Sequence, residues 1–236
     1  MWWYLGRRVL QAIPVLLGST LLIYAMVFAI PGDPIGALFG DKPVSATVKA
    51  QLEAQYNLDK PFIVQWLLFL GNALHGDFGM TYSGRPVNEV LAEVLPVTIK
   101  LAVMALIIEA VFGIIAGFYA GIKRGGFFDS TMLIVSLLVI AVPIFVFGFV
   151  MQLIFGVKLG IAPIVVGSDP SIPDLIVPAF VLGLVSFAYV LRLTRTSVVE
   201  NLTGDHVRTA RAKGLSDGQV NRRHVLRNSM IPVVTY

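Results

Sequence analysis

Residues 101–122 read LAVMALIIEAVFGIIAGFYAGI, and Glu109 is the single charged residue among these 22 positions. An α-helix rises about 1.5 Å per residue, so about 20 apolar residues cross the roughly 30 Å hydrocarbon core of a bilayer. Three further runs, of 22, 28 and 17 residues, contain no charged residue: 9–30, 130–157 and 175–191. The sequence therefore predicts an all-α membrane protein, a polytopic bundle with four spanning helices at 9–30, 97–122, 130–157 and 175–191, and the start of a fifth at 231–236.

The composition supports a membrane protein and excludes two other classes. Of the 236 residues, 56% are hydrophobic and 14% are charged, the mean hydropathy is +0.81 and the formal net charge is +4. A water-soluble domain is typically about 25% charged, and a disordered chain combines low hydrophobicity with high net charge. The lipid bilayer is therefore the first expected partner.

No residue pattern typical of an enzyme or of a metal site occurs in the sequence. Cysteine is absent, so disulfides, thiolate-bound metals and cysteine nucleophiles are excluded. The three histidines form no local ligand pattern, and the chain contains no Walker-type glycine loop, no G-x-S-x-G and no H-E-x-x-H. We predict no catalytic residue, no bound cofactor and no metal in this chain.

The distribution of basic residues predicts a cytoplasmic N-terminus. Arg7 and Arg8 precede the first run, which is longer than the apolar core of a signal peptide, about 7 to 15 residues, and is interpreted as a retained span. With segments 1–8, 123–129 and 192–230 inside and 31–96 and 158–174 outside, 12 of the 18 basic residues are cytoplasmic. This agrees with the positive-inside rule, and it accounts for the net charge without nucleic acid as a partner.

The long outside segment, residues 31–96, contains three amphipathic patterns. Apolar residues recur at helical spacing within 45–56, 61–74 and 87–94, and Pro31-Gly32-Asp33-Pro34 is typical of a turn. Two interpretations stay open. The segment is either a docking surface or gate above a translocation path, or a cap that shields the ends of the spanning helices.

Small residues on the second predicted span indicate close helix packing. Gly113, Gly117 and Gly121 follow one another at four-residue intervals, and glycines at this spacing let the backbone of a second helix approach closely in a membrane. Packing within the chain is favoured over homodimerisation through this face.

Glu109 is an intramembrane carboxylate, and charge within a span is costly. We expect it to face the bundle interior or a wet cavity, and a structural hydrogen bond and a role in the pathway are both open. Pro143 and Pro178 lie in the third and fourth runs, where each removes a backbone hydrogen bond and permits a kink.

Residues 200–232 read ENLTGDHVRTARAKGLSDGQVNRRHVLRNSMIP. Asp205 is a plausible N-cap, Lys213 lies in the last turn and Gly214 is a suitable left-handed stop, which predicts a helix of about nine residues. Ser216 and Gln219 form a capping box for a second helix that runs toward Asn228.

The short predicted helix is not expected to be stable without docking. Val207, Ala210, Arg211 and Gly214 lie along one face of it, and the two small residues would let this face settle deeply into a groove on a partner. The alternative is an ordinary basic loop that positive-inside topology retains.

Several motifs, in order along the chain, carry a family resemblance. DHVRTARAKGL at 205–215, His224 ten residues after Gly214, and LRNSMIP at 226–232 resemble the EAA loop of permease subunits of ATP-binding-cassette importers. The dipeptide, oligopeptide and nickel family, and its first permease subunit, is indicated by further motifs: Arg7-Arg8, Pro-Gly-Asp-Pro at 31–34, Leu-Asp-Lys-Pro at 58–61, Gly-Asp-Phe-Gly at 76–79, Gly-Arg-Pro-Val at 84–87 and Ser-Phe-Ala-Tyr at 186–189.

The resemblance implies a type I importer permease in a bacterial cytoplasmic membrane, with a permease core at about 97–236, that carries di- or oligopeptides inward. The implied partners are a second homologous permease, two ABC ATPase subunits that bind ATP and magnesium, and an extracytoplasmic peptide-binding protein. A nickel or glutathione importer of the same family is the first alternative. A gradient-driven transporter or channel, and a structural membrane anchor, are alternatives from other classes.

Site residues follow from the resemblance by position. His206 stands where the family often has an aromatic residue, usually tyrosine. The implied ATPase-coupling residues are Asp205, Val207, Ala210, Arg211, Lys213 and Gly214, and the residues implied to brace the loop are His224, Asn228 and Pro232.

Family members usually have six spanning helices, two of which follow this loop. The sequence ends at Tyr236, where the fifth would begin. We therefore expect four helices alone not to form a complete half-channel, and a chain ending there not to transport.

Overall fold

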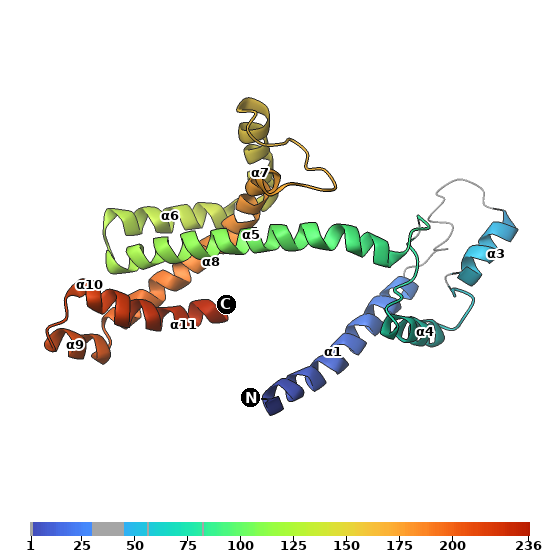
Figure 1. The fold of residues 1–236 in the computed structure, drawn as a ribbon, viewed down its shortest axis with the longest axis horizontal. Helices are drawn as coiled ribbons and strands as arrows, with labels where there is room; N and C mark the ends of the chain where they lie inside the picture. Colours follow the sequence, from blue (N-terminus) through green and yellow to red (C-terminus); the bar gives the residue numbers. More distant parts are fainter. Residues whose placement is uncertain (1, 30–44, 56, 82) are drawn as a thin grey trace. The chain divides into compact units, whose positions relative to one another are not determined.

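The structure is a computed structural model that describes residues 2–29, 45–55, 57–81 and 83–236 (Figure 1). The chain forms two compact units, Met1–Glu93 (unit 1) and Val94–Tyr236 (unit 2). Within the described ranges the regular elements are all helices, and one isolated antiparallel bridge joins Met80 and Pro86. The predicted all-α class is confirmed, whereas the predicted turn at 31–34 lies outside the described residues.

Apolar helices of spanning length make up a large part of the described chain. Three are long and apolar enough to cross a membrane among the residues described: α1 (Trp2–Ala29), α5 (Val87–Ile122) and α8 (Ile172–Leu202). A fourth span exists only if α6 (Phe127–Ala141) and the helix that follows it are counted as one bent span. The number and length of these apolar helices are those of a polytopic membrane protein.

The predicted span 130–157 is not one straight helix. It breaks after α6, and α7 (Ile144–Met151) continues as a π-helix, η1 (Gln152–Lys158), at an angle of 100° to α6. Val142 and Pro143 are extended at the break, with ψ of 128° and 138°. Proline has no N–H to donate and disfavours helical geometry in the residue before it, so the chain turns here.

Two helices are longer than the sequence pattern predicted. The amphipathic pattern at 87–94 and the span at 97–122 form one helix, α5, which passes through Pro96. The span predicted at 175–191 belongs to α8, which begins at Ile172 and continues to Leu202. A capping box sets its start, because the Asp174 carboxylate accepts hydrogen bonds from the backbone N–H and the hydroxyl of Ser171.

Unit 1 contains α1, α3 (Ala46–Gln55), α4 (Phe62–Leu74) and the first turns of α5. The indole N–H of Trp66 on α4 donates to the hydroxyl of Thr20 on α1 over 3.1 Å, and the rings of Tyr24 and Phe69 lie 5.4 Å apart. Within unit 1, α1 and α4 are therefore joined by one hydrogen bond and one aromatic contact. The two residues of the hydrogen bond are 46 positions apart in the sequence.

The segment before α5 is stabilised by side chains of α5 itself. The amide of Asn88 donates to the carbonyl of Gly76 over 2.6 Å, and the Arg85 guanidinium donates to the Glu93 carboxylate over 2.6 Å. Because Glu93 accepts this hydrogen bond, the pKa of Arg85 is raised above its ordinary value. Arg85 is thus charged at any physiological pH.

Unit 2 continues beyond α8 into three short helices and a second π-helix. These are α9 (Asp205–Ala212), α10 (Asp217–Val220), η2 (Asn221–Leu226) and α11 (Arg227–Thr235). They gather at the C-terminal end of α8, and α11 lies against α8 (Figure 1). A buried cluster is centred here, and its members are Val198, Val207, Ala210, Val220 and Val225.

Candidate functional site

A glycine lies just before the short helix α9 and another lies just after its C-cap, Lys213. Gly204 is the N-cap, in an extended conformation, and Asp205 is the first helical residue. The prediction that Asp205 caps the helix is therefore wrong by one position, because no side chain caps this end. At the other end Gly214 has φ of +84° and its N–H donates to the carbonyl of Arg211 over 2.9 Å, so the predicted left-handed stop is confirmed.

The small face of α9 packs inward. Val207 and Ala210, two of the residues predicted to enter a partner's groove, are 0% and 5% exposed in the buried cluster. They lie there with Val198 of α8, while Arg211 and Gly214 remain exposed. The predicted four-residue docking face is therefore split into a buried pair and an exposed pair. Removing the apolar side chains of Val207 and Ala210 from water is favourable, and this chain's own core already does so.

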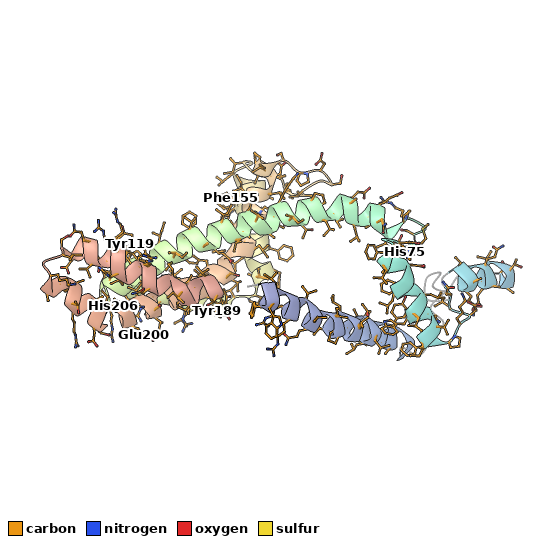
Figure 2. The ribbon with its side chains drawn as sticks, turned by 60° about the horizontal axis from the view of Figure 1, so that its bottom comes forward. His75, Tyr119, Phe155, Tyr189, Glu200 and His206 are labelled. Atoms are coloured by element: carbon orange, nitrogen blue, oxygen red, sulfur yellow. The ribbon has the colours of Figure 1, made fainter. Side chains whose placement is uncertain are left out.

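Two arginines and one aspartate are the charged residues on the exposed side of α9. Arg208 lies 3.6 Å from Asp205, and Arg211 donates to Asp217 of α10 over 3.2 Å. Both pairs are exposed, so they orient side chains more than they stabilise the fold. His206 is exposed as well (Figure 2), and its ring lies over Gly204, where an added Cβ would stand 2.6 Å from Cε1.

After α9 the chain returns through α10, η2 and α11, here called the returning helix. Its buried positions lie next to the three residues implied to brace the loop. The capping box of Ser216 and Gln219 is confirmed. Beyond it His224, Asn228 and Pro232 are half-buried. The residue that follows each of them is buried, and these residues are Val225, Ser229 and Val233. Two of these three are apolar, which is the signal that sequence reasoning missed.

The three glycines of α5 lie directly against α8. A Cβ built on Gly113 would stand 2.8 Å from Cγ1 of Val190, and one on Gly121 would stand 2.6 Å from Cγ1 of Val198. A Cβ on Gly117 would stand 2.5 Å from the carbonyl oxygen of Leu191. The structure therefore has this face packed within the chain, and not free for a second copy.

A part-buried ion pair that the sequence did not reveal joins α6 to α8. Arg195 donates from Nε and Nη2 to the two carboxylate oxygens of Asp129, over 2.7 and 2.8 Å. The backbone N–H of Gly125 donates to the same carboxylate over 2.9 Å. Asp129 stands at the end of a predicted loop, and Arg195 is one of the twelve basic residues predicted on the cytoplasmic side, so only their proximity in space distinguishes them.

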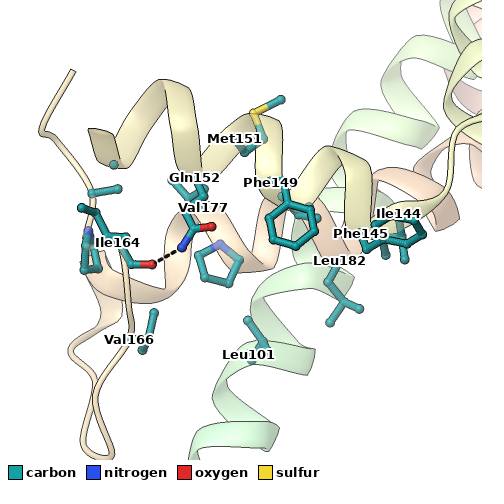
Figure 3. A pocket seen from close by; sticks show the side chains of 16 residues that line it. Leu101, Ile144, Phe145, Phe149, Met151, Gln152, Ile164, Val166, Val177 and Leu182 are labelled. Atoms are coloured by element: carbon teal, nitrogen blue, oxygen red, sulfur yellow. Dashed lines mark hydrogen bonds between the residues drawn. The ribbon is translucent and has the colours of Figure 1, made fainter. Parts of the chain in front are cut away.

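An apolar cavity of about 440 Å³ lies between α7, η1, the loop after η1 and α8 (Figure 3). The amide of Gln152 donates to the carbonyl of Ile164 over 2.6 Å and holds the loop over it. Leu101 of α5 also lines this cavity, whereas Glu109 does not. Glu109 is half-buried, and within the described chain its carboxylate has neither a hydrogen bond nor an ion pair.

No group of three or more His, Cys, Asp or Glu side chains able to hold a metal ion occurs in the part of the chain that the structure describes. At the α9 end, a short helix with one exposed side rests on a buried cluster to which α8, α9, α10 and η2 all contribute.

Two family models and several characterised proteins match this sequence. The model for the binding-protein-dependent transport system inner membrane component matches residues 113–236, and the model for the N-terminal part of such a membrane component matches residues 1–102. The sequence is 34% identical to the di/tripeptide transport system permease protein DppB of Pseudomonas aeruginosa, over 98% of this chain and 77% of that protein.

Two further relatives have similar coverage. The dipeptide transport system permease protein DppB of Escherichia coli K12 is 35% identical over 98% of this chain and 77% of its own length. The oligopeptide transport system permease protein AppB of Bacillus subtilis is 35% identical over 98% of this chain and 76% of its own length. These matches confirm the resemblance to importer permeases. The chain belongs to the family of binding-protein-dependent transport system inner membrane components and is a multi-pass protein of the bacterial cytoplasmic membrane.

Proposed function

We propose that this chain is one of two homologous permease subunits of an ABC importer that carries di- or oligopeptides into the cell. The relatives at about 35% identity are named as dipeptide, di/tripeptide and oligopeptide permeases, which supports a peptide substrate. Two ATPase subunits and an extracytoplasmic peptide-binding protein complete the proposed assembly. ATP and magnesium bind to the ATPases and not to this chain.

The observation that carries the mechanism is the buried cluster that α9 shares with α8. Val207 and Ala210, on the inner face of α9, lie in this cluster with Val198 near the end of the long span, and Val220 of α10 and Val225 of η2 complete it. The exposed side of α9 and of the turn after it is accessible to another protein, and its charged residues and the terminal glycine are Asp205, Arg208, Arg211, Lys213 and Gly214. We propose that an ATPase subunit binds this side and that its motion reaches α8 through the two buried residues.

The proposed contact gives different roles to residues that the resemblance grouped together. Asp205, Arg211, Lys213 and Gly214 form the surface that touches the ATPase, whereas Val207 and Ala210 transmit its motion. Because basic side chains outnumber acidic ones on this exposed side, we expect an acidic groove on the ATPase. His224, Asn228 and Pro232, half-buried on the returning helix, support α9 from behind.

Cysteine crosslinking tests this contact directly, because the chain has no cysteine of its own. We expect Lys213→Cys to crosslink to an ATPase subunit in the assembled importer. Ser168→Cys, exposed on the predicted outside loop, is the matched control and should not crosslink. Crosslinking of Ser168→Cys but not Lys213→Cys would contradict both the contact and the proposed orientation.

Transport itself is tested by peptide uptake in vesicles that contain the complete importer. Uptake that requires ATP and the peptide-binding protein is expected. Uptake that continues without ATP and is driven by an ion gradient would instead support a gradient-driven transporter. Import of nickel or glutathione in place of peptides would correct only the substrate.

A further inference from the structure

The ion pair of Asp129 and Arg195 lies where three parts of unit 2 meet α8. The side chain of Asp129 is 3% exposed and that of Arg195 is 22% exposed. Both carboxylate oxygens accept from the guanidinium, and one also accepts from the N–H of Gly125. This geometry fixes the distance and the orientation between the first turn of α6 and α8.

The same stretch of α8 packs against α5 and shares a buried cluster with α9. A Cβ on Gly117 would stand 3.2 Å from the backbone nitrogen of Arg195, and one on Gly121 would stand 3.1 Å from its carbonyl oxygen. Val198, one turn further on, belongs to the buried cluster with Val207 of α9. Less than two turns of α8 therefore hold the ends of α5 and α6 and the inner face of α9.

Stability alone is a weak explanation for this pair. Burying the Asp129 carboxylate costs desolvation free energy, although Arg195 at 22% exposed keeps part of its hydration, and apolar side chains of similar volume often serve a fold equally well. A bidentate guanidinium–carboxylate pair does supply something that apolar packing does not, which is a single fixed orientation. Its position therefore suggests a requirement for fixed geometry.

We propose that Asp129 and Arg195 are positioning residues that make α6 follow the motion of α8, and so carry the motion of α9 to the bent span. This inference rests on the proposed function. The path runs from Val207 to Val198, along α8 to Arg195, and across the ion pair to Asp129. Beyond Asp129, α6 leads to the break at Val142–Pro143 and to the apolar cavity beside α7.

Removing the ion pair of Asp129 and Arg195 should have a different effect if it positions helices than if it only stabilises the fold. A stabilising pair would affect the amount of folded importer, whereas a positioning pair should separate ATP hydrolysis from peptide uptake in an importer that still assembles. Two variants are informative. Arg195→Lys keeps the charge but not the two-pronged contact, and the double variant Asp129→Leu/Arg195→Met fills the site without leaving a buried charge unpaired.

The test uses the complete importer in proteoliposomes and measures assembled complex, ATP hydrolysis and uptake of a radiolabelled dipeptide. In the double variant we expect normal assembly and an uptake per ATP hydrolysed that falls at least about fivefold, the lower end of typical coupling between sites. Arg195→Lys should show a smaller loss in the same ratio. The control is Lys49→Gln/Glu53→Gln, which removes an exposed pair on α3 at 4.0 Å and should leave the ratio unchanged.

An unchanged ratio in a double variant that assembles normally would overturn the inference. This result would leave the proposed function intact, because the unmodified importer would still couple ATP hydrolysis to uptake. Failure of the proposed function would appear separately, as absence of ATP-dependent peptide uptake in the unmodified importer.

Discussion

Gly117 of α5 lies so close to Leu191 of α8 that a Cβ added to the glycine would stand 2.5 Å from the leucine's carbonyl oxygen. A backbone oxygen within a helix cannot move aside as a flexible side chain can. The two helices would therefore have to separate to admit even one methyl group, and the residue type at position 117 determines how closely α5 and α8 approach.

Gly117→Ala is expected to destabilise the protein by about 1 to 3 kcal/mol, the usual cost of overpacking. The measurement is the thermal midpoint of the purified protein in detergent. Gly18→Ala on α1 is the matched control, since nothing lies within 4 Å of a Cβ there, and alanine is favoured over glycine within a helix. Equal midpoints for the two variants would contradict the close approach of α5 and α8.

Val207→Ala tests whether the buried cluster holds α9 on α8. The side chain is fully buried, so shortening it leaves a small cavity and should weaken the docking of α9 by about 2 kcal/mol. Hydrogen exchange of the α9 amides should become faster, while exchange in the middle of α8 should not change. Arg208→Ala, at the neighbouring exposed position, should leave α9 protected, and loss of protection in that control alone would contradict the cluster's role.

Gly214→Ala tests the left-handed stop of α9. A residue with a Cβ is strained at φ of +84°, by about 1 kcal/mol or more. We expect a lower thermal midpoint and weaker co-purification of the ATPase subunit. Gly218→Ala is the control, because that glycine lies in α10 with open space around it, and it should keep both properties at their original values.

Pro143→Ala tests the cause of the bend between α6 and α7. Alanine restores a backbone N–H and removes the constraint on Val142, so we expect the helix to continue and the angle of 100° to open. Spin labels on Ile134→Cys and Val157→Cys, both exposed, should then lie further apart in a pulsed EPR measurement.

The control for the bend is Pro178→Ala with the same two labels. Pro178 lies inside α8, which passes through it as one helix, so the label distance should not change. An unchanged distance in Pro143→Ala would show that packing of α7 on α8, and not the proline, determines the angle.

The candidate site could be predicted in part. Gly214 and the capping box of Ser216 and Gln219 were predictable because each acts through backbone groups a few residues away. Which face of α9 is exposed was not predictable. Val207 and Ala210 are equally suited to a partner's groove and to this chain's own core, and the choice depends on Val198, Val220 and Val225, which other elements bring to them.

The sequence by itself determined that this is a helical membrane protein of a permease family, because apolar runs of bilayer length and local motifs depend on neighbouring residues alone. Only the tertiary structure decided the 100° break after α6, the burial of α9's small face and the pairing of Asp129 with Arg195. The last of these joins residues 66 positions apart. No local pattern reports such a distance, since it depends on how whole helices pack.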